Sequence, residues 1–338
     1  MFVLLIYGAI QPGDATEGNA IDGVSSKHPS TELWQAVRQR NDLMQPGKTQ
    51  VRSVDAAVLI NEYGDQWARF RMQTLTRVAV YILGAMVLIV MLFYLIRGKV
   101  KIQSGLSGKM VFRFTDYERV LHWVLALVFL FLAITGLTLL LGRDLLIPLL
   151  GQELFSLLAS SSKEGHNLFG PIFLVSIVLM LIKFMRRNIY EKGDLAWLLK
   201  GGGFIGKSHV TGGFFNMGEK SWYWLVIIIG LVISVSGLIL VSPGFGQGRV
   251  MMEISHLVHA SGAIILIAIS IGHMYLGSVG TEGTSEGMKT GYVDINWAAE
   301  HHDRWAKTCQ DNDEVISAEQ YAALKGEQPA AKLEDTSS

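Results

Sequence analysis

The sequence predicts an all-α membrane protein in which four transmembrane helices form a bundle and one additional helix precedes them. Half of the 338 residues are hydrophobic, and only 17% are charged. Five apolar stretches are long enough to cross a bilayer, which takes roughly 20 helical residues. The net charge is zero, which gives no indication of nucleic-acid binding. The single cysteine, Cys309, excludes intrachain disulfides and Cys-ligated clusters, so any metal centre must use histidine.

The five predicted spans follow one another along the chain. Their ranges are Val78–Ile96, Val120–Leu141, Leu168–Phe184, Trp222–Val241 and Ile254–Val279. Residues 1–10 are apolar but too short to cross, and they resemble the core of a signal peptide without its basic start. A cleaved signal and a retained segment both remain open. The apolar stretch Ile147–Leu158 is also short, and we expect it to lie along the outer membrane interface.

Loop charges predict the orientation, because Lys and Arg concentrate in cytoplasmic loops. The loops after the first and third spans are rich in both, whereas the other two loops hold only Arg143, Lys163 and Arg249. This places the N-terminal part in the periplasm and the C-terminus in the cytoplasm of a bacterial inner membrane. The expected divisions are a periplasmic segment at 1–77, an extra helix at 78–97, the bundle at 112–307 and a flexible tail at 308–338.

Histidines occur at matching depths in the predicted bundle. His259 and His273 are about 21 Å apart along one helix and about 40° from four full turns, so both point the same way. His122 opens the second span at the inner face, and His166 opens the third at the outer face. Depth therefore pairs His122 with His273 and His166 with His259. Two bis-histidine haems, hence a dihaem bundle, are favoured over four histidines satisfied by hydrogen bonds.

The remaining histidines are weaker candidates. His256 is an alternative outer ligand, but it is about 100° out of phase with His273 on a helix and is expected at the interface. The others lie in polar segments and are expected to be solvated: His28, His209, His301 and His302. Of these, His301 and His302 could touch a cytoplasmic proton path.

Gly136 and Arg119 are candidate haem contacts. Gly136 lies on the same helix face as His122, where a missing Cβ would admit a flat macrocycle. Packing between helices is an equal alternative for this glycine. Arg119, one turn before His122, is a candidate partner for an inner propionate or an ordinary interfacial anchor. Further candidates are Gly170 and Gly262 for haem contact, and Arg143 and Arg249 for outer propionates.

Six motifs occur in a fixed order: RVLHW, EGHNLFGP, FNMGEK, LVHASGA, GHMYLGS and EHHDRW. In order and spacing they resemble the cytochrome b556 (gamma) subunit of membrane-bound, quinone-linked formate dehydrogenases, over about residues 112–307. The resemblance implies two haems b ligated by His122, His166, His259 and His273, in agreement with the pairing by depth. The first span and the long outer segment depart from four-span members and are similar to an extended form, whose role is open.

The resemblance also implies a quinone site and partner subunits. Menaquinone or ubiquinone would bind beside the inner haem at Asn216, Gly218 and His273, although Asn216 could equally be a helix N-cap. Formate would be oxidised on a molybdenum- or tungsten-containing alpha subunit, and electrons would arrive through an Fe–S beta subunit. The chain would thus be the electron-transfer subunit of an enzyme, without catalytic residues for formate, in a complex whose oligomeric state is open. Candidate proton carriers are Asp116, Glu219 and Glu300.

Three other functions fit parts of the pattern. The haem b subunit of a NiFe hydrogenase or of another quinone-linked molybdoenzyme shares the two-haem bundle, but FNMGEK and EHHDRW favour formate dehydrogenase. A proton-driven transporter would carry charged or broken helices at mid-membrane, and the middle of each span lacks Asp, Glu, Lys and Arg. A membrane anchor without cofactor would show no haem spectrum.

Overall fold

The computed structural model describes residues 62–200 and 211–326. The chain divides into two compact units, Met1–Val78 and Ala79–Ser338. In the first unit, Glu62–Arg69 forms helix α3 and Phe70–Leu75 continues as a π-helix, with the Trp67 and Phe70 rings stacked at 5.9 Å. The signal-like start and most of the predicted periplasmic segment lie outside the described residues.

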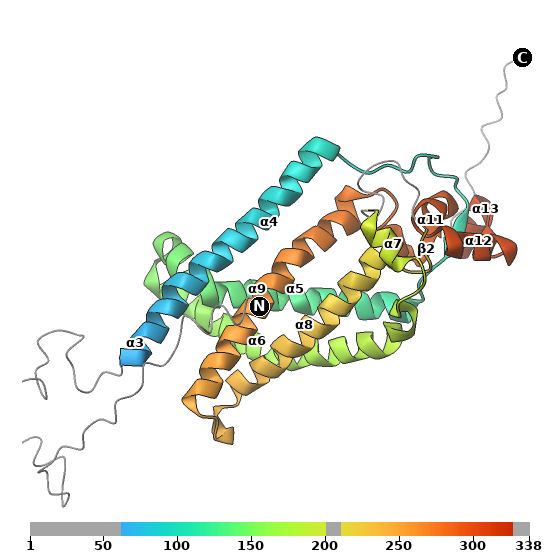
Figure 1. Cartoon of the computed structure of the whole chain (residues 1–338). Coiled ribbons are helices and arrows are strands. Elements are labelled where there is room, and N and C mark those ends of the chain that lie inside the picture. The colour runs from blue at the N-terminus through green and yellow to red at the C-terminus, as the bar shows by residue number, and fades with distance from the viewer. Residues whose placement is uncertain (1–61, 201–210, 327–338) are drawn as a thin grey trace, which may run out of the picture. The chain divides into compact units, whose positions relative to one another are not determined.

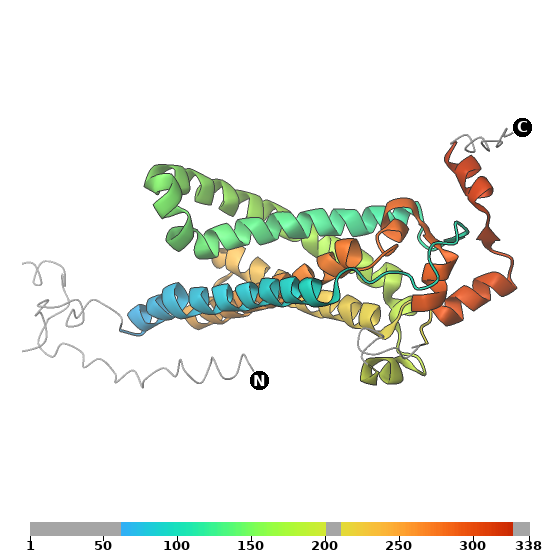
Figure 2. The same cartoon turned by 90° about the horizontal axis from the view of Figure 1, so that it is seen from above.

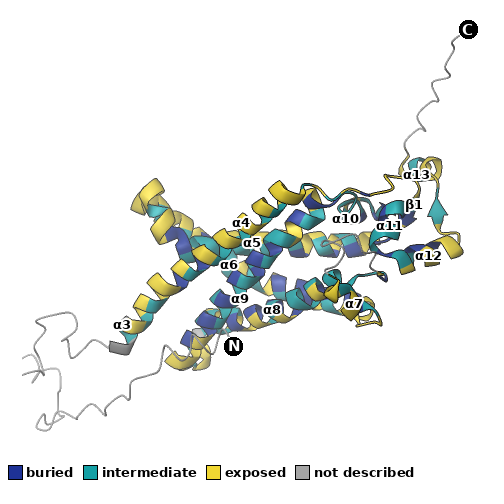
Figure 3. Cartoon of the chain, turned by 45° about the horizontal axis from the view of Figure 1, so that its top comes forward, coloured by how far each residue is buried: buried dark blue, intermediate teal, exposed yellow. Residues whose placement is uncertain are grey.

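Five helices in the described ranges are long and apolar enough to cross a membrane. They are α4 (Thr76–Arg97), α5 (Asp116–Leu145), α6 (Ile147–Phe184), α8 (Met217–Val241) and α9 (Arg249–Tyr275). Each predicted span falls within one of these helices, except that the last runs on into a π-helix at Leu276–Gly280. Figure 3 shows exposed residues along these helices. The exposed apolar side chains include Leu88, Leu127 and Ile182. Exposed apolar side chains at this density are typical of helices that face lipid.

Helices α5, α6, α8 and α9 form the bundle. The closest packing joins α5 with α6, α8 with α9, and α6 with α8, and α5 and α6 run side by side as a helical hairpin (Figures 1 and 2). The bundle core includes Leu121 from α5, Phe173 and Ile177 from α6, and Ile227 from α8. Helix α4 contacts α9, where the Phe93 ring meets Tyr275 edge-on at 6.1 Å.

Local signals set the helix ends. Thr115 and Asn216 cap α5 and α8, each in a capping box with the glutamate three residues later. The expectation of a separate interfacial segment at Ile147–Leu158 is wrong, because this stretch begins α6. The helix bends at Gly151, whose φ of 76° favours glycine. Sequence composition could not show that the two apolar stretches belong to one helix, because the mostly polar residues 159–167 separate them.

A small domain, which we call the lobe (residues 98–115 and 281–326), closes one end of the bundle (Figure 1). Among the described residues it holds one sheet in the order β2-β1-β3, with both neighbours antiparallel to β1. The strands are β1 (Met110–Phe112), β2 (Tyr292–Asp294) and β3 (Val315–Ile316), and the helices are α10 (Glu286–Thr290), α11 (Ile295–His301), α12 (Asp303–Asp311) and α13 (Ala318–Lys325). The all-α prediction thus holds for the bundle, and the sheet is an addition to it.

The predicted flexible tail at 308–338 is corrected for its described part. Residues 308–326 continue α12 and then form β3 and α13. Cys309 is 1% exposed and packs in a core with Val111, Val293 and Trp297, so this segment has an apolar anchor. Residues 327–338 lie outside the described ranges. A strand of two residues is too short for a period-2 pattern, which is why the composition indicated a tail.

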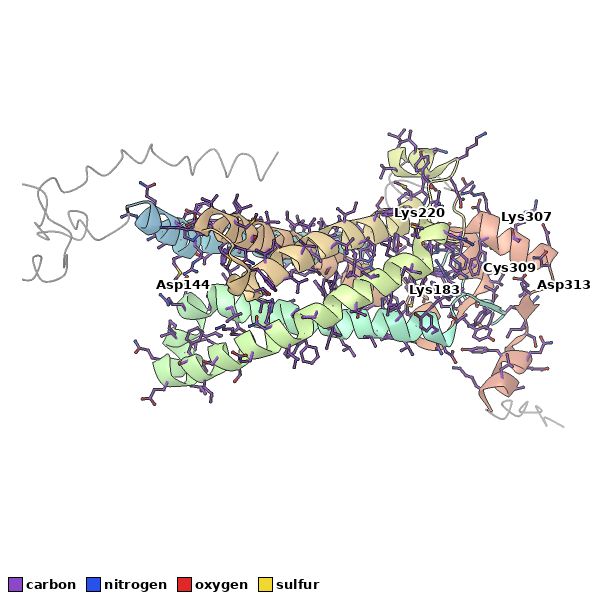
Figure 4. All side chains as sticks on the ribbon, turned by 90° about the horizontal axis from the view of Figure 1, so that it is seen from below. Asp144, Lys183, Lys220, Lys307, Cys309 and Asp313 are labelled. Carbon is purple, nitrogen blue, oxygen red and sulfur yellow. The ribbon has the colours of Figure 1, made fainter. Side chains whose placement is uncertain are left out.

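Charged residues gather at the lobe end of the bundle. Figure 4 shows Lys183 and Lys220 there, with Asp144 at the opposite end. Lys220 Nζ donates to Asp194 Oδ2 at 2.9 Å, and both side chains are 3% exposed. Asp194 begins the short helix α7 (Asp194–Leu199), which this ion pair fixes to the start of α8. Glu118, 1% exposed, accepts from Arg187 Nη1 at 2.9 Å and so joins α5 to the end of α6.

Candidate functional site

The bundle brings four histidines together in two pairs. At the lobe end, the ring centroids of His122 and His273 are 6.5 Å apart with 59° between the planes. At the opposite end, those of His166 and His259 are 6.0 Å apart with 75° between the planes. We call these the lobe-side pair and the distal pair. Helix α9 gives one ring to each pair, and α5 and α6 give the others. These are the two pairings that depth along the sequence predicts.

The spacing within each pair fits one metal ion between two rings. An imidazole nitrogen binds a first-row metal at about 2 Å, and it lies roughly 1 Å from its ring centre, so two facing ligands have centroids about 6 Å apart. No cluster of three or more His, Cys, Asp or Glu side chains able to hold a metal occurs in the described ranges. Two protein ligands suit a metal whose remaining ligands come from a prosthetic group, as in haem.

Hydrogen bonds orient the distal pair. His166 Nδ1 is 2.9 Å from Thr135 Oγ1, whose own hydrogen goes to the carbonyl of Phe131 at 2.8 Å. His259 Nδ1 is 2.8 Å from the Ile233 carbonyl, which can only accept. Both Nδ1 atoms therefore carry the hydrogen, and both Nε2 atoms keep a lone pair for a metal. This arrangement is typical of histidine ligands, whose second nitrogen donates to the protein.

Two glycines lie directly against the distal rings. A Cβ on Gly136 would be 3.2 Å from His166 Cε1, and a Cβ on Gly237 would be 3.0 Å from His259 Cε1. For Gly136 the sequence left haem contact and helix packing equally open, and the structure places this glycine against the His166 ring. Gly237 was missed, although its position in the fourth span at the distal level was a usable signal. A Cβ on Gly262 would meet Ile233, which indicates helix packing, whereas one on Gly170 would have open space.

The lobe-side pair has a different surrounding. The Trp222 ring of α8 stacks on His273 at 4.5 Å with 14° between the planes. His122 Nδ1 is buried and has no hydrogen-bond partner within the part of the chain that the structure describes. A buried unsatisfied polar group costs roughly 1–3 kcal/mol, so it marks a site that something else completes. Trp222 was not singled out from the sequence, where tryptophans near helix ends are ordinary interfacial anchors.

Two of the three predicted quinone residues, Asn216 and Gly218, lie at the start of α8, and the third, His273, lies on α9. Asn216 Oδ1 accepts the backbone N–H of Glu219 at 3.0 Å, so the N-cap alternative is the role that the structure shows. A Cβ on Gly218 would be 2.8 Å from the Trp197 ring, which explains the glycine by packing. Since Trp222 lies one turn farther on and stacks on His273, this helix start lies beside the lobe-side pair.

Arg119 contacts the lobe. Its Nη1 donates to the Lys289 carbonyl and its Nη2 to Asp116 Oδ1, each at 2.6 Å. These contacts agree with the anchor interpretation, and both terminal nitrogens are engaged by protein. At the other end, Arg249 Nε donates to Glu253 Oε1 at 2.7 Å.

A buried arginine ties the lobe to α8. The Arg113 side chain is 2% exposed, and its Nη2 donates to Glu219 Oε1 at 3.1 Å and to the Phe214 carbonyl at 3.0 Å. Its guanidinium lies 4.8 Å from the centre of the Trp297 ring, one of five aromatic rings around it. Burial lowers the pKa of Arg113 from its usual value, and Glu219 opposes that shift. Arginine keeps its charge at such sites.

The expectation that His302 is solvated is wrong. Its side chain is completely buried, with Nδ1 3.0 Å from the Gly213 carbonyl and Nε2 3.6 Å from Glu219 Oε2. Burial, followed by the charges of Arg113 and His301, lowers the pKa of His302 well below its usual value. His301 is half-buried and stacks on Trp297 at 5.1 Å. The polar composition of this segment hid the burial, because the apolar residues that cover it come from distant parts of the chain.

Comparison with known proteins gives one family. Residues 113–291 match the family model for prokaryotic cytochrome b561. The chain is 30% identical to the cytochrome b556(Fdn) subunit of the nitrate-inducible formate dehydrogenase of Escherichia coli K12 over 210 residues, which are 59% of this chain and 91% of that protein. It is 26% identical to the cytochrome b556(fdo) subunit of a formate dehydrogenase from the same strain over 199 residues, covering 58% and 91%. The cytochrome b556 subunit of Haemophilus influenzae formate dehydrogenase is 24% identical over 218 residues, covering 61% and 84%.

The matched region is more than half of the chain and contains both histidine pairs. The five apolar helices agree with a membrane-embedded protein. This chain is therefore an integral membrane protein that belongs to the prokaryotic cytochrome b561 family.

Proposed function

We propose that this chain is the cytochrome b subunit of a membrane-bound formate dehydrogenase, and that it carries electrons to a quinone. The names of the relatives support the enzyme, and the histidine pairs support the electron path. The observation that carries the proposal is the spacing of His259 and His273, about 21 Å of rise along α9. Two redox centres at that spacing would span most of a hydrocarbon layer of about 30 Å.

The two pairs would hold two haems b. His122 and His273 would bind the inner one, and His166 and His259 the outer one. Haem b would supply a one-electron couple at each pair, and two histidine ligands for each iron would favour electron transfer over oxygen chemistry. The protein contributes the orientation of the ligands, through the Nδ1 contacts of the distal pair and the ring of Trp222 at the lobe-side pair.

Menaquinone or ubiquinone is the proposed electron acceptor, beside His273 at the start of α8. Asn216 uses its Oδ1 as the helix cap, so its side-chain NH₂ is the part that can donate to a quinone oxygen. The stacked pair of Trp222 and His273 holds this end of α8 against the lobe-side pair. One residue would thus serve both as a cap and as a quinone contact.

The orientation follows from the basic loops. Lys183, Arg187 and Lys220 lie at the lobe end, which is the cytoplasmic side if Lys and Arg mark the inner face. The distal pair would then face the periplasm, where an Fe–S beta subunit delivers electrons from formate oxidised on a molybdenum or tungsten alpha subunit. Electrons that move inward while protons are taken from the cytoplasm store about 2.3 kcal/mol per charge per 100 mV.

Replacement of the distal ligand tests the path. In the purified complex, His259→Ala should remove the outer haem, lower the haem content from about two to about one per chain, and block reduction of the remaining haem by formate. His256→Ala, one turn away on the same helix, is the control and should keep both haems. Normal quinone reduction by formate in His259→Ala would refute the path. Identification of the co-purified large subunit as a hydrogenase would refute the assignment to formate dehydrogenase while leaving the haem path intact.

Two variants of Asn216 separate its cap role from quinone binding. Asn216→Asp keeps an oxygen that can cap the helix but loses the NH₂ group, whereas Asn216→Leu loses both. Both variants should slow quinone turnover while formate still reduces both haems. Only Asn216→Leu should also lower thermal stability, by about 0.5–2 kcal/mol. Unchanged quinone kinetics in Asn216→Asp would move the quinone site elsewhere.

A further inference from the structure

Two hydrogen-bond acceptors face each other where α8 meets the lobe. Glu219 is the third residue of α8, and His302 directly follows α11. His302 Nε2 lies 3.6 Å from Glu219 Oε2 and, among the described residues, has no hydrogen-bond partner. This separation is slightly long for a hydrogen bond and too short for a water molecule to fit between the two atoms. The two groups therefore act on each other directly.

Their other contacts fix where hydrogens can be. The Gly213 carbonyl can only accept, so His302 Nδ1 carries the hydrogen of that 3.0 Å contact. In a neutral ring, Nε2 is then an acceptor aimed at the carboxyl group. Glu219 Oε1 accepts from Arg113, and Oε2 accepts the backbone N–H of Asn216 at 3.0 Å. If Glu219 were ionised and His302 neutral, two lone pairs would face each other at a buried nitrogen, which is unfavourable. One added proton removes this conflict.

The surrounding charges limit the pair to a single proton. Arg113 is positive and contacts Glu219, and the His302 side chain is completely buried, so a second positive charge on the His302 ring is opposed. The His301 ring packs against His302 as well. This geometry favours the carboxyl side of the pair as the place of the proton. Other charged side chains at this junction pair among themselves: Glu191 with Arg304 at 3.1 Å and with Lys220 at 3.6 Å, and Lys220 with Asp194 at 2.9 Å. Arg113 is the cation in direct contact with Glu219.

The pair lies close to the lobe-side histidines. Glu219 is three residues, about one helical turn, before Trp222, whose ring stacks on His273. The Glu219 side chain is 34% exposed, whereas His302 is fully buried, so Glu219 is the member that exchanges with its surroundings. We propose that Glu219 and His302 together hold one exchangeable proton and deliver it to the quinone beside His273. The delivery step rests on the proposed function, and the shared proton does not.

The proton balance is simple. Reduction of a quinone to a quinol takes two electrons, which the proposed electron path supplies, and two protons. The pair gives one of them: the O–H bond of Glu219 breaks, and an O–H bond forms on the quinol. Water on the exposed side of Glu219 then returns that proton from the medium. The second proton comes from water directly, because the pair stores only one.

Infrared spectroscopy of the purified complex with its haems bound tests the shared proton. At about pH 7, wild type should show a carboxylic acid C=O band that shifts in D₂O, although an ordinary glutamate is ionised there. Glu219→Gln should remove this band. His302→Asn keeps a donor near the Nδ1 position but lacks Nε2, so Glu219 should ionise and the band should disappear. The control His301→Asn should retain it. If His302→Asn does not assemble, His302→Gln, which places an amide near the Nε2 position, takes its place with the same expected loss.

Kinetics test the delivery. Haems reduced by formate are reoxidised with a water-soluble menaquinone analogue across about pH 6 to 8, the range in which histidine chemistry changes most. Wild type and His301→Asn should show nearly flat rates, whereas His302→Asn should be about tenfold or more slower at the alkaline end and near wild type at the acidic end.

Each outcome bears on a different claim. An ionised Glu219 beside a neutral His302 in wild type would refute the shared proton. A clear band combined with a flat pH profile in His302→Asn would refute the delivery. Unchanged reoxidation in Asn216→Asp would refute the quinone site while the infrared result stood.

Discussion

Replacement of Gly237 by alanine adds one atom, a Cβ, beside His259 and so tests whether the distal pair binds a haem. The added Cβ would lie 3.0 Å from His259 Cε1 and 3.2 Å from its Nδ1, whereas ordinary contacts begin at 3.4 Å. The ring must therefore move by about 0.4 Å, which exceeds the roughly 0.2 Å tolerance of metal–ligand distances. Overpacking costs about 1–3 kcal/mol, and alanine regains about 1 kcal/mol of helix propensity. The fold should survive at a cost of about 0–2 kcal/mol, while the ligand is displaced.

Haem content and spectra of the purified complex measure the effect. We expect Gly237→Ala to lose or alter the outer haem while the inner haem keeps its low-temperature optical and paramagnetic resonance signals. Gly136→Ala, with a Cβ 3.2 Å from His166 Cε1, should show the same change to a smaller extent. Gly84→Ala is the matched control, because a Cβ there meets nothing within 4 Å. Two unaltered haems in the double variant Gly136→Ala/Gly237→Ala would refute the assignment of the distal pair.

Three further changes test other parts of the structure. Arg113→Met removes the hydrogen bonds to the Phe214 carbonyl and to Glu219 and should destabilise the lobe by about 1–3 kcal/mol, measured by limited proteolysis; unchanged protease resistance would contradict this. Burial raises the pKa of Cys309 to about 12, above an unfolded value of about 8.5, so its contribution to stability is complete below about pH 8.5 and is lost as the pH rises toward 12. Alkylation at about pH 8.5 should accordingly need denaturant, and rapid labelling of the folded complex would contradict the burial. Trp222→Leu removes a ring contact worth about 0.5–1.5 kcal/mol and should change only the paramagnetic resonance signal of the haem proposed at His273; an altered signal from the distal pair would contradict this.

The sequence was informative wherever one helix carried the whole pattern. The span positions depend on continuous apolar runs, and the pairing of His259 with His166 depends on depth along helices that are nearly straight rods. Both can be worked out without knowing how the helices pack. The N-cap at Asn216 was also readable, because a cap and its glutamate lie three residues apart.

Features that need distant segments could not be predicted from the sequence. Gly237 matters because α8 and α9 approach closely there, and the stacking of Trp222 on His273 depends on how those two helices are rotated. His302 lies in a polar stretch, and its burial depends on Arg113 and its aromatic surroundings. The composition of a short segment does not indicate which distant residues will pack against it.

The sheet of the lobe joins chain segments that are made far apart in time during translation. The backbone N–H of Ser107 donates to Asp294, 187 residues later, and Met110 pairs with the same aspartate. These contacts can form only after the last span has been synthesised. A chain whose synthesis stops early would leave Arg113 uncovered and Val111 without its neighbours. The sheet therefore forms only in a complete chain. In a truncated chain both edges of β1 would be unpaired, and an unpaired strand is a feature that proteases could recognise.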